Sequence, residues 1–199
     1  MSLILICGCT RSATTYTAVL LKKLGLEVAH ERLARDGTVS FELAVDESLW
    51  IPNHSQLFSS SKIFIHQVRH PLKVIKSNQF LNEKTTWKFI YKHIDAEPSE
   101  PILLRCAKYW YYWNILIENR SDWRFKIEDI DDVFYELCNR VGVKPNREVL
   151  KNIPRDIRTR MTESYGRKYL DVSWNMLEDL DKELCNKIKE KTLEYGYSL

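Results

Sequence analysis

A run of mostly small and hydroxyl-bearing residues near the N-terminus is typical of an anion-binding loop. It reads Gly8-Cys9-Thr10-Arg11-Ser12-Ala13-Thr14-Thr15. In a tight turn before a helix, backbone N–H groups and the positive end of the helix can together bind a phosphate. The hydroxyls of Thr14 and Thr15 add donors, and the Arg11 guanidinium can hold an oxygen of a group in transfer. The run therefore predicts an anion site, although Thr14 acting only as a helix cap would also explain it.

The same loop departs from the Walker A pattern of ATP-binding loops, GxxxxGK[ST]. Gly8 and Thr15 match that pattern. Ala13 replaces the second glycine, and Thr14 replaces the lysine that neutralises the β and γ phosphates. The missing lysine argues against an ordinary ATPase or kinase. A Cβ at position 13 is acceptable only if that residue keeps φ below zero.

A second pair of candidate anion ligands lies in the middle of the chain. Arg69 follows the apolar run Lys62 to Val68, and Ser77 stands eight positions later, beyond Pro71. Proline is suited to the first turn of a helix, so Ser77 should lie on a helix along which the Arg69 side chain can fold back. Together the two side chains can hold a second phosphate. An ordinary salt bridge and an exposed helical serine are the alternative.

These motifs resemble those of sulfotransferases that use 3′-phosphoadenosine 5′-phosphosulfate (PAPS). Their 5′-phosphosulfate motif, P-[KR]-[ST]-G-T-T-W, is similar to the residues from Thr10 to Tyr16, which have Thr, Ala and Tyr where the family has Pro, Gly and Trp. Their 3′-phosphate motif resembles the segment from Arg69 to Ser77. Phe125 to Ile130 and Leu193 to Tyr197 resemble the family's Tyr-Glu-Asp-Leu segment and C-terminal helix ending.

The resemblance implies the residues that bind the donor, and it is closest to short bacterial-type members, which carry a His-Glu and an Asp-Gly after the second strand. The donor-binding residues would be Gly8, Thr10, Arg11, Ser12, Ala13, Thr14, Thr15, Tyr16, Arg69, Ser77 and Arg167. Tyr16 would either stack on the adenine or belong to the core. Arg11 would also neutralise charge on the leaving oxygens. Sulfuryl transfer of this kind needs no metal.

The general base for the acceptor is expected just beyond the second strand, where parallel sheets place their ligands. Glu31 is the favoured residue, and His30 is the second choice. Because neighbouring residues of an extended segment point in opposite directions, only one of them should face the site. A solvated Glu31 paired with a nearby arginine is the alternative. Weaker candidates are Asp36 and Glu42, whereas His66 is expected to be a hydrogen-bonded core histidine.

The elements that must position these residues form a βαβ pattern. Strands are expected at Leu3 to Cys7, Leu26 to Ala29, Lys62 to Val68 and Arg124 to Ile127. Helices are expected at Thr14 to Leu24, from Pro71, at Pro101 to Asn119, Ile130 to Val141 and Trp174 to Tyr195. The pattern predicts one domain over residues 1–199, a three-layer α/β fold with a central parallel sheet flanked by helices. The resemblance to sulfotransferases implies that this fold is similar to that of P-loop NTPases. Trp110 and Trp113 should be mostly core, and Glu83 to Glu100 and Lys151 to Asp171 are expected to be flaps.

The amino-acid composition argues against a nucleic-acid-binding protein and against a membrane-spanning one. Of 199 residues, 44% are hydrophobic and 29% charged, and 30 Lys and Arg against 27 Asp and Glu leave a net charge of +3. So small a surplus does not indicate a nucleic-acid partner. No apolar run approaches a membrane span, and five cysteines without a CxxC pair indicate reduced thiols in the cytoplasm. The expected function is sulfuryl transfer to a hydroxyl of a small molecule or, preferably, a carbohydrate. A P-loop kinase and a catalytically silent nucleotide-binding module are the alternatives.

Overall fold

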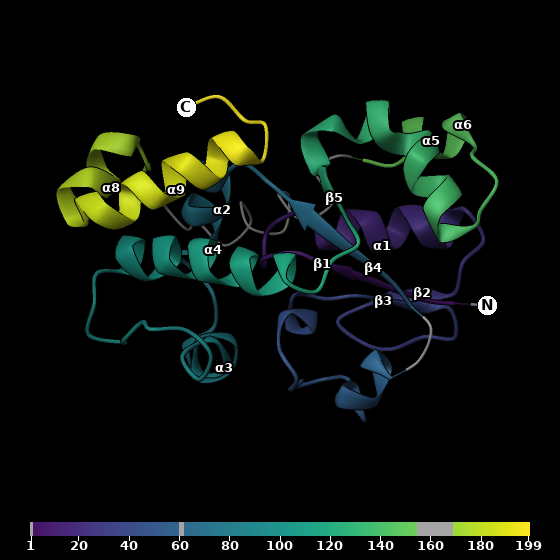
Figure 1. Ribbon diagram of the computed structural model, residues 1–199, viewed down its shortest axis with the longest axis horizontal. Coiled ribbons are helices and arrows are strands. Elements are labelled where there is room, and N and C mark those ends of the chain that lie inside the picture. Colours follow the sequence, from purple (N-terminus) through teal and green to yellow (C-terminus); the bar gives the residue numbers. More distant parts are fainter. Residues whose placement is uncertain (1, 60–61, 155–168) are drawn as a thin grey trace.

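A five-stranded parallel sheet forms the centre of the protein. The computed structural model describes residues 2–59, 62–154 and 169–199. Within these residues the strands are β1 (Leu3–Cys7), β2 (Val28–His30), β3 (Gly37–Val39), β4 (Lys62–Val68) and β5 (Trp123–Lys126), in the order β2-β3-β1-β4-β5. All neighbouring pairs are parallel (Figure 1). The predicted central parallel sheet is confirmed.

The two central strands are buried on both faces, as their unbroken apolar runs predict. In β1, Leu5 and Cys7 belong to one hydrophobic cluster, while Ile4 and Ile6 belong to the other. Successive side chains of a strand point to opposite faces, so each run supplies both cores. Two layers of helices cover these faces.

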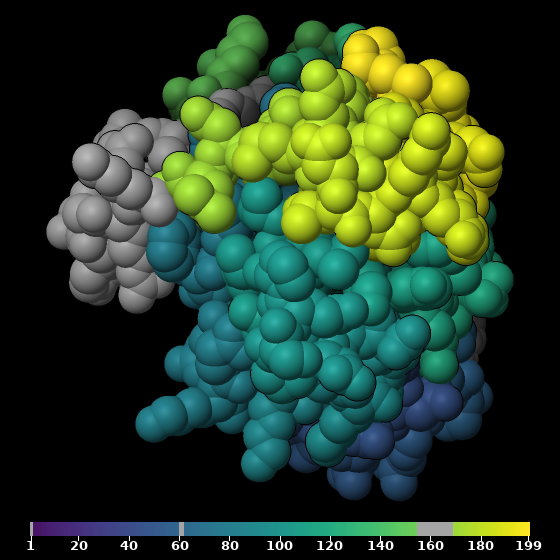
Figure 2. All heavy atoms as spheres, turned by 90° about the vertical axis from the view of Figure 1, so that its left-hand side faces the viewer, coloured from purple at the N-terminus to yellow at the C-terminus, as the bar shows by residue number. Residues whose placement is uncertain are grey.

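One helix layer consists of α1 (Thr14–Lys23), α5 (Ile130–Val141) and α6 (Arg147–Lys151). The other contains α2 (Pro71–Asn78), α4 (Ile102–Glu118), α8 (Trp174–Leu180) and α9 (Lys182–Glu194). Figure 1 shows the two groups on either side of the sheet. Seen from the side in Figure 2, the yellow-green C-terminal helices lie against the teal residues of α4. The fold is therefore three-layered α/β. Among the described residues, no helix is both long enough and apolar enough to cross a bilayer.

Strand β3 was not predicted, and β2 begins two residues later than expected. Only three residues long, β3 lies between β1 and β2 and is held by pairing on both sides. A Cβ built at Gly37, whose φ is +147°, would lie 1.9 Å from the carbonyl oxygen of Ile4. Glycine is needed here because the two strands approach so closely.

The last expected helix, Trp174 to Tyr195, is divided in two. Helix α8 ends at Leu180, and Asp181 Oδ1 accepts a hydrogen bond of 2.9 Å from the Leu184 N–H at the start of α9. Asp181 has extended backbone, with φ of −160°. An aspartate that caps a new helix interrupts an apolar pattern that continues through the break.

The segment expected to be the first flap is held by buried aromatic and aliphatic side chains. It contains a single π-helical turn, η3 (Glu83–Trp87), and the short α3 (Lys88–Ile90). Trp87 and Ile90 are fully buried, and Phe89 is 2% exposed. Because polar residues surround these three side chains in the sequence, their burial was not predicted. Most of Lys151 to Asp171 lies outside the described residues.

Candidate functional site

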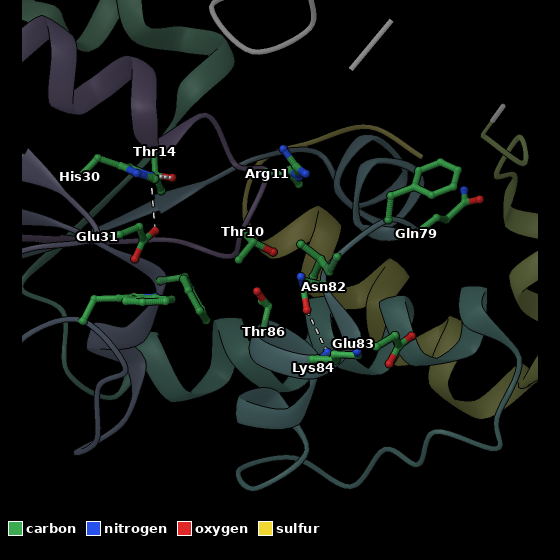
Figure 3. A pocket seen from close by; sticks show the side chains of 14 residues that line it. Thr10, Arg11, Thr14, His30, Glu31, Gln79, Asn82, Glu83, Lys84 and Thr86 are labelled. Atoms are coloured by element: carbon green, nitrogen blue, oxygen red, sulfur yellow. Dashed lines mark hydrogen bonds and ion pairs between the residues drawn. The ribbon is translucent and has the colours of Figure 1, made fainter. Parts of the chain in front are cut away.

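A cavity of about 1000 Å³ opens at the carboxyl edge of the sheet. Because all strands are parallel, the loops after β1, β2 and β3 meet at this edge. One wall carries the predicted residues Thr10, Arg11, Thr14, His30 and Glu31. Figure 3 shows His30, Thr14 and Glu31 clustered on one side, with Gln79, Asn82 and Glu83 on the other.

The β1–α1 loop contains two non-glycine residues in the left-handed region of backbone conformation. The φ angle is 67° at Arg11 and 63° at Ala13. An alanine at position 13 was expected to be acceptable only with a φ below zero. The observed φ is positive, so Ala13 is strained. Each such residue costs about 1–2 kcal/mol and persists only where its surroundings hold it. Strain of this kind concentrates at functional sites, and here it lies beside the cavity.

The start of α1 leaves donors available for an anion. Its N-cap residue is Ala13, whose side chain cannot bond to the helix, so the alternative that Thr14 serves as the helix cap is wrong. Within the described parts of the chain, no carbonyl or side chain accepts a hydrogen bond from the N–H groups of Ala13, Thr14 or Thr15. These amides and the positive end of the helix dipole form a site that suits a phosphate or sulfate group.

The end of β4 supports the loop through two long polar side chains. Gln67 Nε2 donates to the carbonyl oxygen of Ser12, and Gln67 Oε1 accepts from Thr17 Oγ1 at 2.6 Å. Arg69 Nη1 donates to the carbonyl oxygen of Arg11 at 2.8 Å. Gly8 completes this contact, because a Cβ there would lie 2.4 Å from the carbonyl oxygen of Gln67. The two anion motifs of the sequence are therefore joined directly, through Arg69 and Arg11.

His30 and Glu31 both line the cavity, so the expectation that only one of them faces it is wrong. Glu31 has a φ of 55°, which breaks the alternation of a strand, while its N–H donates to the Val39 carbonyl at 3.1 Å. Glu31 Oε1 lies 3.3 Å from His30 Nε2, and Glu31 Oε2 accepts a hydrogen bond from Ser40 Oγ. The carboxylate is thus held by ordered partners at the cavity wall rather than on a solvated loop.

The imidazole of His30 joins this carboxylate to the start of α1. Its Nε2 atom lies 3.0 Å from Thr14 Oγ1 and 3.3 Å from Thr15 Oγ1. The His30 and Glu31 side chains are 16% and 23% exposed. A base candidate and the donors of the anion loop are therefore in direct contact within one cavity.

No family model matches this chain, and no curated protein matches it either. Functional inference therefore depends on the residue types and geometry of the cavity.

Several other predicted residues are buried around the loop. Ser12 is 1% exposed, and Tyr16 is 4% exposed within the core cluster of α1 and α5. Ser77 is half-buried on α2. Arg167 lies outside the described residues.

The weaker candidates lie elsewhere. Asp36 precedes β3, at the amino edge of the sheet, where its carboxylate accepts from the Glu27 N–H at 2.7 Å. His66 is fully buried and bonds Asn114 Oδ1 through Nε2 at 2.9 Å, which confirms it as a core histidine. Burial lowers the pKa of His66 to about 3. Trp110 and Trp113 are also fully buried core residues, as expected.

Trp50 is among the cavity residues that sequence reasoning missed. It is 55% exposed and is presented by a turn that depends on a buried carboxylate, Glu42. Glu42 Oε2 accepts from the Leu49 N–H at 3.0 Å and from Ser48 Oγ, and Ser48 Oγ in turn accepts from the Trp50 N–H at 3.1 Å. Burial raises the pKa of Glu42. A lone tryptophan between Leu49 and Ile51 was the only sequence signal.

Proposed function

We propose that this protein is a sulfotransferase, which moves a sulfuryl group from PAPS to a hydroxyl acceptor by in-line displacement. The observation that carries the proposal is the contact of the His30–Glu31 pair with the anion loop. Together they can hold an activated anionic donor beside a group able to accept a proton. In-line group transfer needs little else from a protein, because positioning and charge stabilisation do most of the work.

The donor would be bound by the two motifs that Arg69 joins. The amides of the loop and the hydroxyls of Thr14 and Thr15 suit the 5′-phosphosulfate. A guanidinium has five N–H donors, and Arg69 uses one of them on the Arg11 carbonyl. Its remaining donors, with Ser77 on the following helix, would take the 3′-phosphate. This division accounts for the two anion motifs within a P-loop-like α/β fold.

Transfer would proceed in one step, with Glu31 as the base. The acceptor oxygen attacks sulfur while the bond from sulfur to the bridging phosphate oxygen breaks, and 3′-phosphoadenosine 5′-phosphate (PAP) leaves with that electron pair. Glu31 takes the proton of the acceptor hydroxyl. Arg11 stabilises charge on the leaving oxygens, a type of contact worth about 3–4 kcal/mol. No metal has a part in this scheme.

The acceptor would enter from the wall formed by Trp50 and the segment after α2. Aromatic and uncharged polar side chains that line the cavity, such as Trp50, Asn82 and Thr86, suit a carbohydrate hydroxyl. The five cysteines are buried and unpaired, which supports a reducing, cytoplasmic location.

Calorimetric titration with PAP, run beside ATP with Mg²⁺, tests the donor assignment. We expect PAP to bind and ATP to give no heat. Arg69→Ala should weaken PAP about ten- to hundredfold, since it removes charge-assisted hydrogen bonds. Arg140→Ala, which removes an arginine paired with Glu136 on α5, is the matched control and should leave the affinity unchanged.

Two other outcomes would favour other functions. Binding of ATP with Mg²⁺ but not PAP would contradict the proposal and favour a kinase. PAP binding without turnover on any hydroxyl acceptor would favour a silent nucleotide-binding module.

A further inference from the structure

Thr10, in the anion loop between β1 and α1, is held by two side chains from other elements. The Thr10 N–H donates to the hydroxyl of Tyr109 at 3.0 Å, and Thr10 Oγ1 donates to Asn78 Oδ1 at 2.9 Å. Tyr109 lies on α4 and Asn78 ends α2. Both residues have 0% exposed surface, so neither side chain touches a ligand in the cavity. Both donors of Thr10 are thus used within the protein.

The two loop residues after Thr10 are also held by hydrogen bonds from side chains of other elements. The carbonyl of Arg11 is held by Arg69 and that of Ser12 by Gln67. Arg11 lies in the left-handed region, which an unsupported chain would leave. Fixing the residue before it and the carbonyls of the next two opposes that relaxation. The loop is therefore held in its strained form by the protein itself.

Asn78 is expected to lower the stability of the folded protein at its position. Its Nδ2 group is buried and makes no hydrogen bond to any residue that the structure describes. A buried amide with an unsatisfied donor is costly, and an apolar side chain would avoid that cost. Among the described residues, Asn78 Oδ1 accepts a hydrogen bond from Thr10 alone. Violations of local rules of this kind are expected where a residue serves a site.

We propose that Tyr109 and Asn78 are positioning residues, which hold Thr10 so that the loop is formed for its anion before the ligand arrives. Preorganisation of this kind lowers the entropic cost of binding and keeps donors aimed at developing charge. The inference rests on the proposed function for the identity of the nucleotide, but the support of the loop applies to any phosphate-like ligand.

Tyr109→Phe is the sharpest variant to test this. It removes only the hydroxyl and leaves the ring, whose centroid lies 5.2 Å from that of Trp113 and 6.0 Å from that of Trp87. Tyr195→Phe is the matched control, because Tyr195 is also buried but packs on His66 and Trp110, away from Thr10. Asn78→Ala is a second variant that should act in the same direction as Tyr109→Phe.

The readout compares two ligands by calorimetry, PAP and adenosine 3′-phosphate, which has no group for the loop. We expect Tyr109→Phe to weaken PAP about five- to tenfold, the effect of one hydrogen bond, and to leave adenosine 3′-phosphate unchanged. Tyr195→Phe should change neither. Hydrogen exchange at the Thr10 amide should accelerate in Tyr109→Phe and not in Tyr195→Phe. Equal weakening of both ligands, or no weakening of PAP, would overturn the proposal.

Failure of the proposed function is distinguishable from failure of this inference. If the unmodified protein binds neither nucleotide, the sulfotransferase proposal fails. Inorganic phosphate, followed by NMR at the amides of Ala13, Thr14 and Thr15, then tests the loop alone. A weaker phosphate response in Tyr109→Phe than in Tyr195→Phe supports the positioning role. An equal response in the two variants, or no response in the unmodified protein, overturns it.

Discussion

The Nε2 atom of His30 lies 3.3 Å from Oε1 of Glu31, although the two residues are neighbours in the chain. The contact exists because Glu31 adopts a left-handed backbone and turns its carboxylate to the same side as the imidazole. The same Nε2 atom also contacts the hydroxyls of Thr14 and Thr15. A catalytic triad divides its partners between the two ring nitrogens, so this arrangement is not a relay of that type. His30 links Glu31 to the anion loop.

Glu31→Gln should separate chemistry from binding. We expect kcat for sulfuryl transfer to fall at least a hundredfold, because a general base contributes about 10²–10⁴ in rate. The affinity for PAP should stay within twofold, since the role proposed for Glu31 is toward the acceptor and not the donor. His30→Gln should weaken PAP as well, because His30 contacts both threonines. Turnover is measured with saccharide acceptors and PAPS. An unchanged kcat in Glu31→Gln would contradict the assignment of the base.

Ala13→Gly should stabilise the protein. Alanine at φ of 63° is strained, and glycine adopts this conformation freely. We expect the free energy of unfolding, measured in urea, to rise by about 1 kcal/mol. Ala18→Gly, within α1, is the control and should lower that free energy by about 1 kcal/mol or more, through lost helix propensity and packing. A loss of stability in Ala13→Gly would show that the loop does not carry this strain.

Gly8→Ala should disturb the loop through a steric clash, without a change in the preferred backbone conformation. The new Cβ would lie 2.4 Å from a backbone oxygen of Gln67, which cannot move without shifting β4. A loss of about 1–3 kcal/mol in urea unfolding is expected, together with weaker binding of PAP. Gly25→Ala provides the comparison, since position 25 has a φ of +100° but open space around it. If Gly25→Ala alone weakened PAP, the close contact at Gly8 would not be what shapes the site.

His66 should make the protein less stable in acid. Burial lowers the pKa of His66 to about 3 in the folded protein, whereas the unfolded chain takes up the proton near pH 6.5. Between these values the unfolded state binds one more proton, so stability falls as the pH falls, by up to about 1.4 kcal/mol per pH unit.

The comparison is urea unfolding at pH 7 and pH 5 of the unmodified protein and His66→Gln, whose amide can still bond Asn114. We expect the unmodified protein to lose more stability than the variant. All other ionisable groups are the same in both proteins, so their contributions cancel in the difference. Equal losses would contradict the buried, neutral state of His66.

Local patterns were sufficient for the elements that depend on their own residues. The apolar runs of β1 and β4 are long enough to be read as strands buried on both faces. Pro71 at the first turn of α2 predicts a helix start. The small residues between β1 and α1 predict an anion loop at the edge where parallel strands end. These features follow from backbone stereochemistry and side-chain hydrophobicity over a few neighbouring residues.

Other features arise only when distant segments meet. Strand β3 has three residues and is a strand because β1 and β2 pair with it on either side. The left-handed conformation of Ala13 and the shared direction of His30 and Glu31 are set by packing rather than by residue preference. Tyr109 reaches Thr10 across 99 positions of the chain. The sequence alone determined the chemistry available at the site, whereas its geometry was decided by contacts between elements that no local propensity encodes.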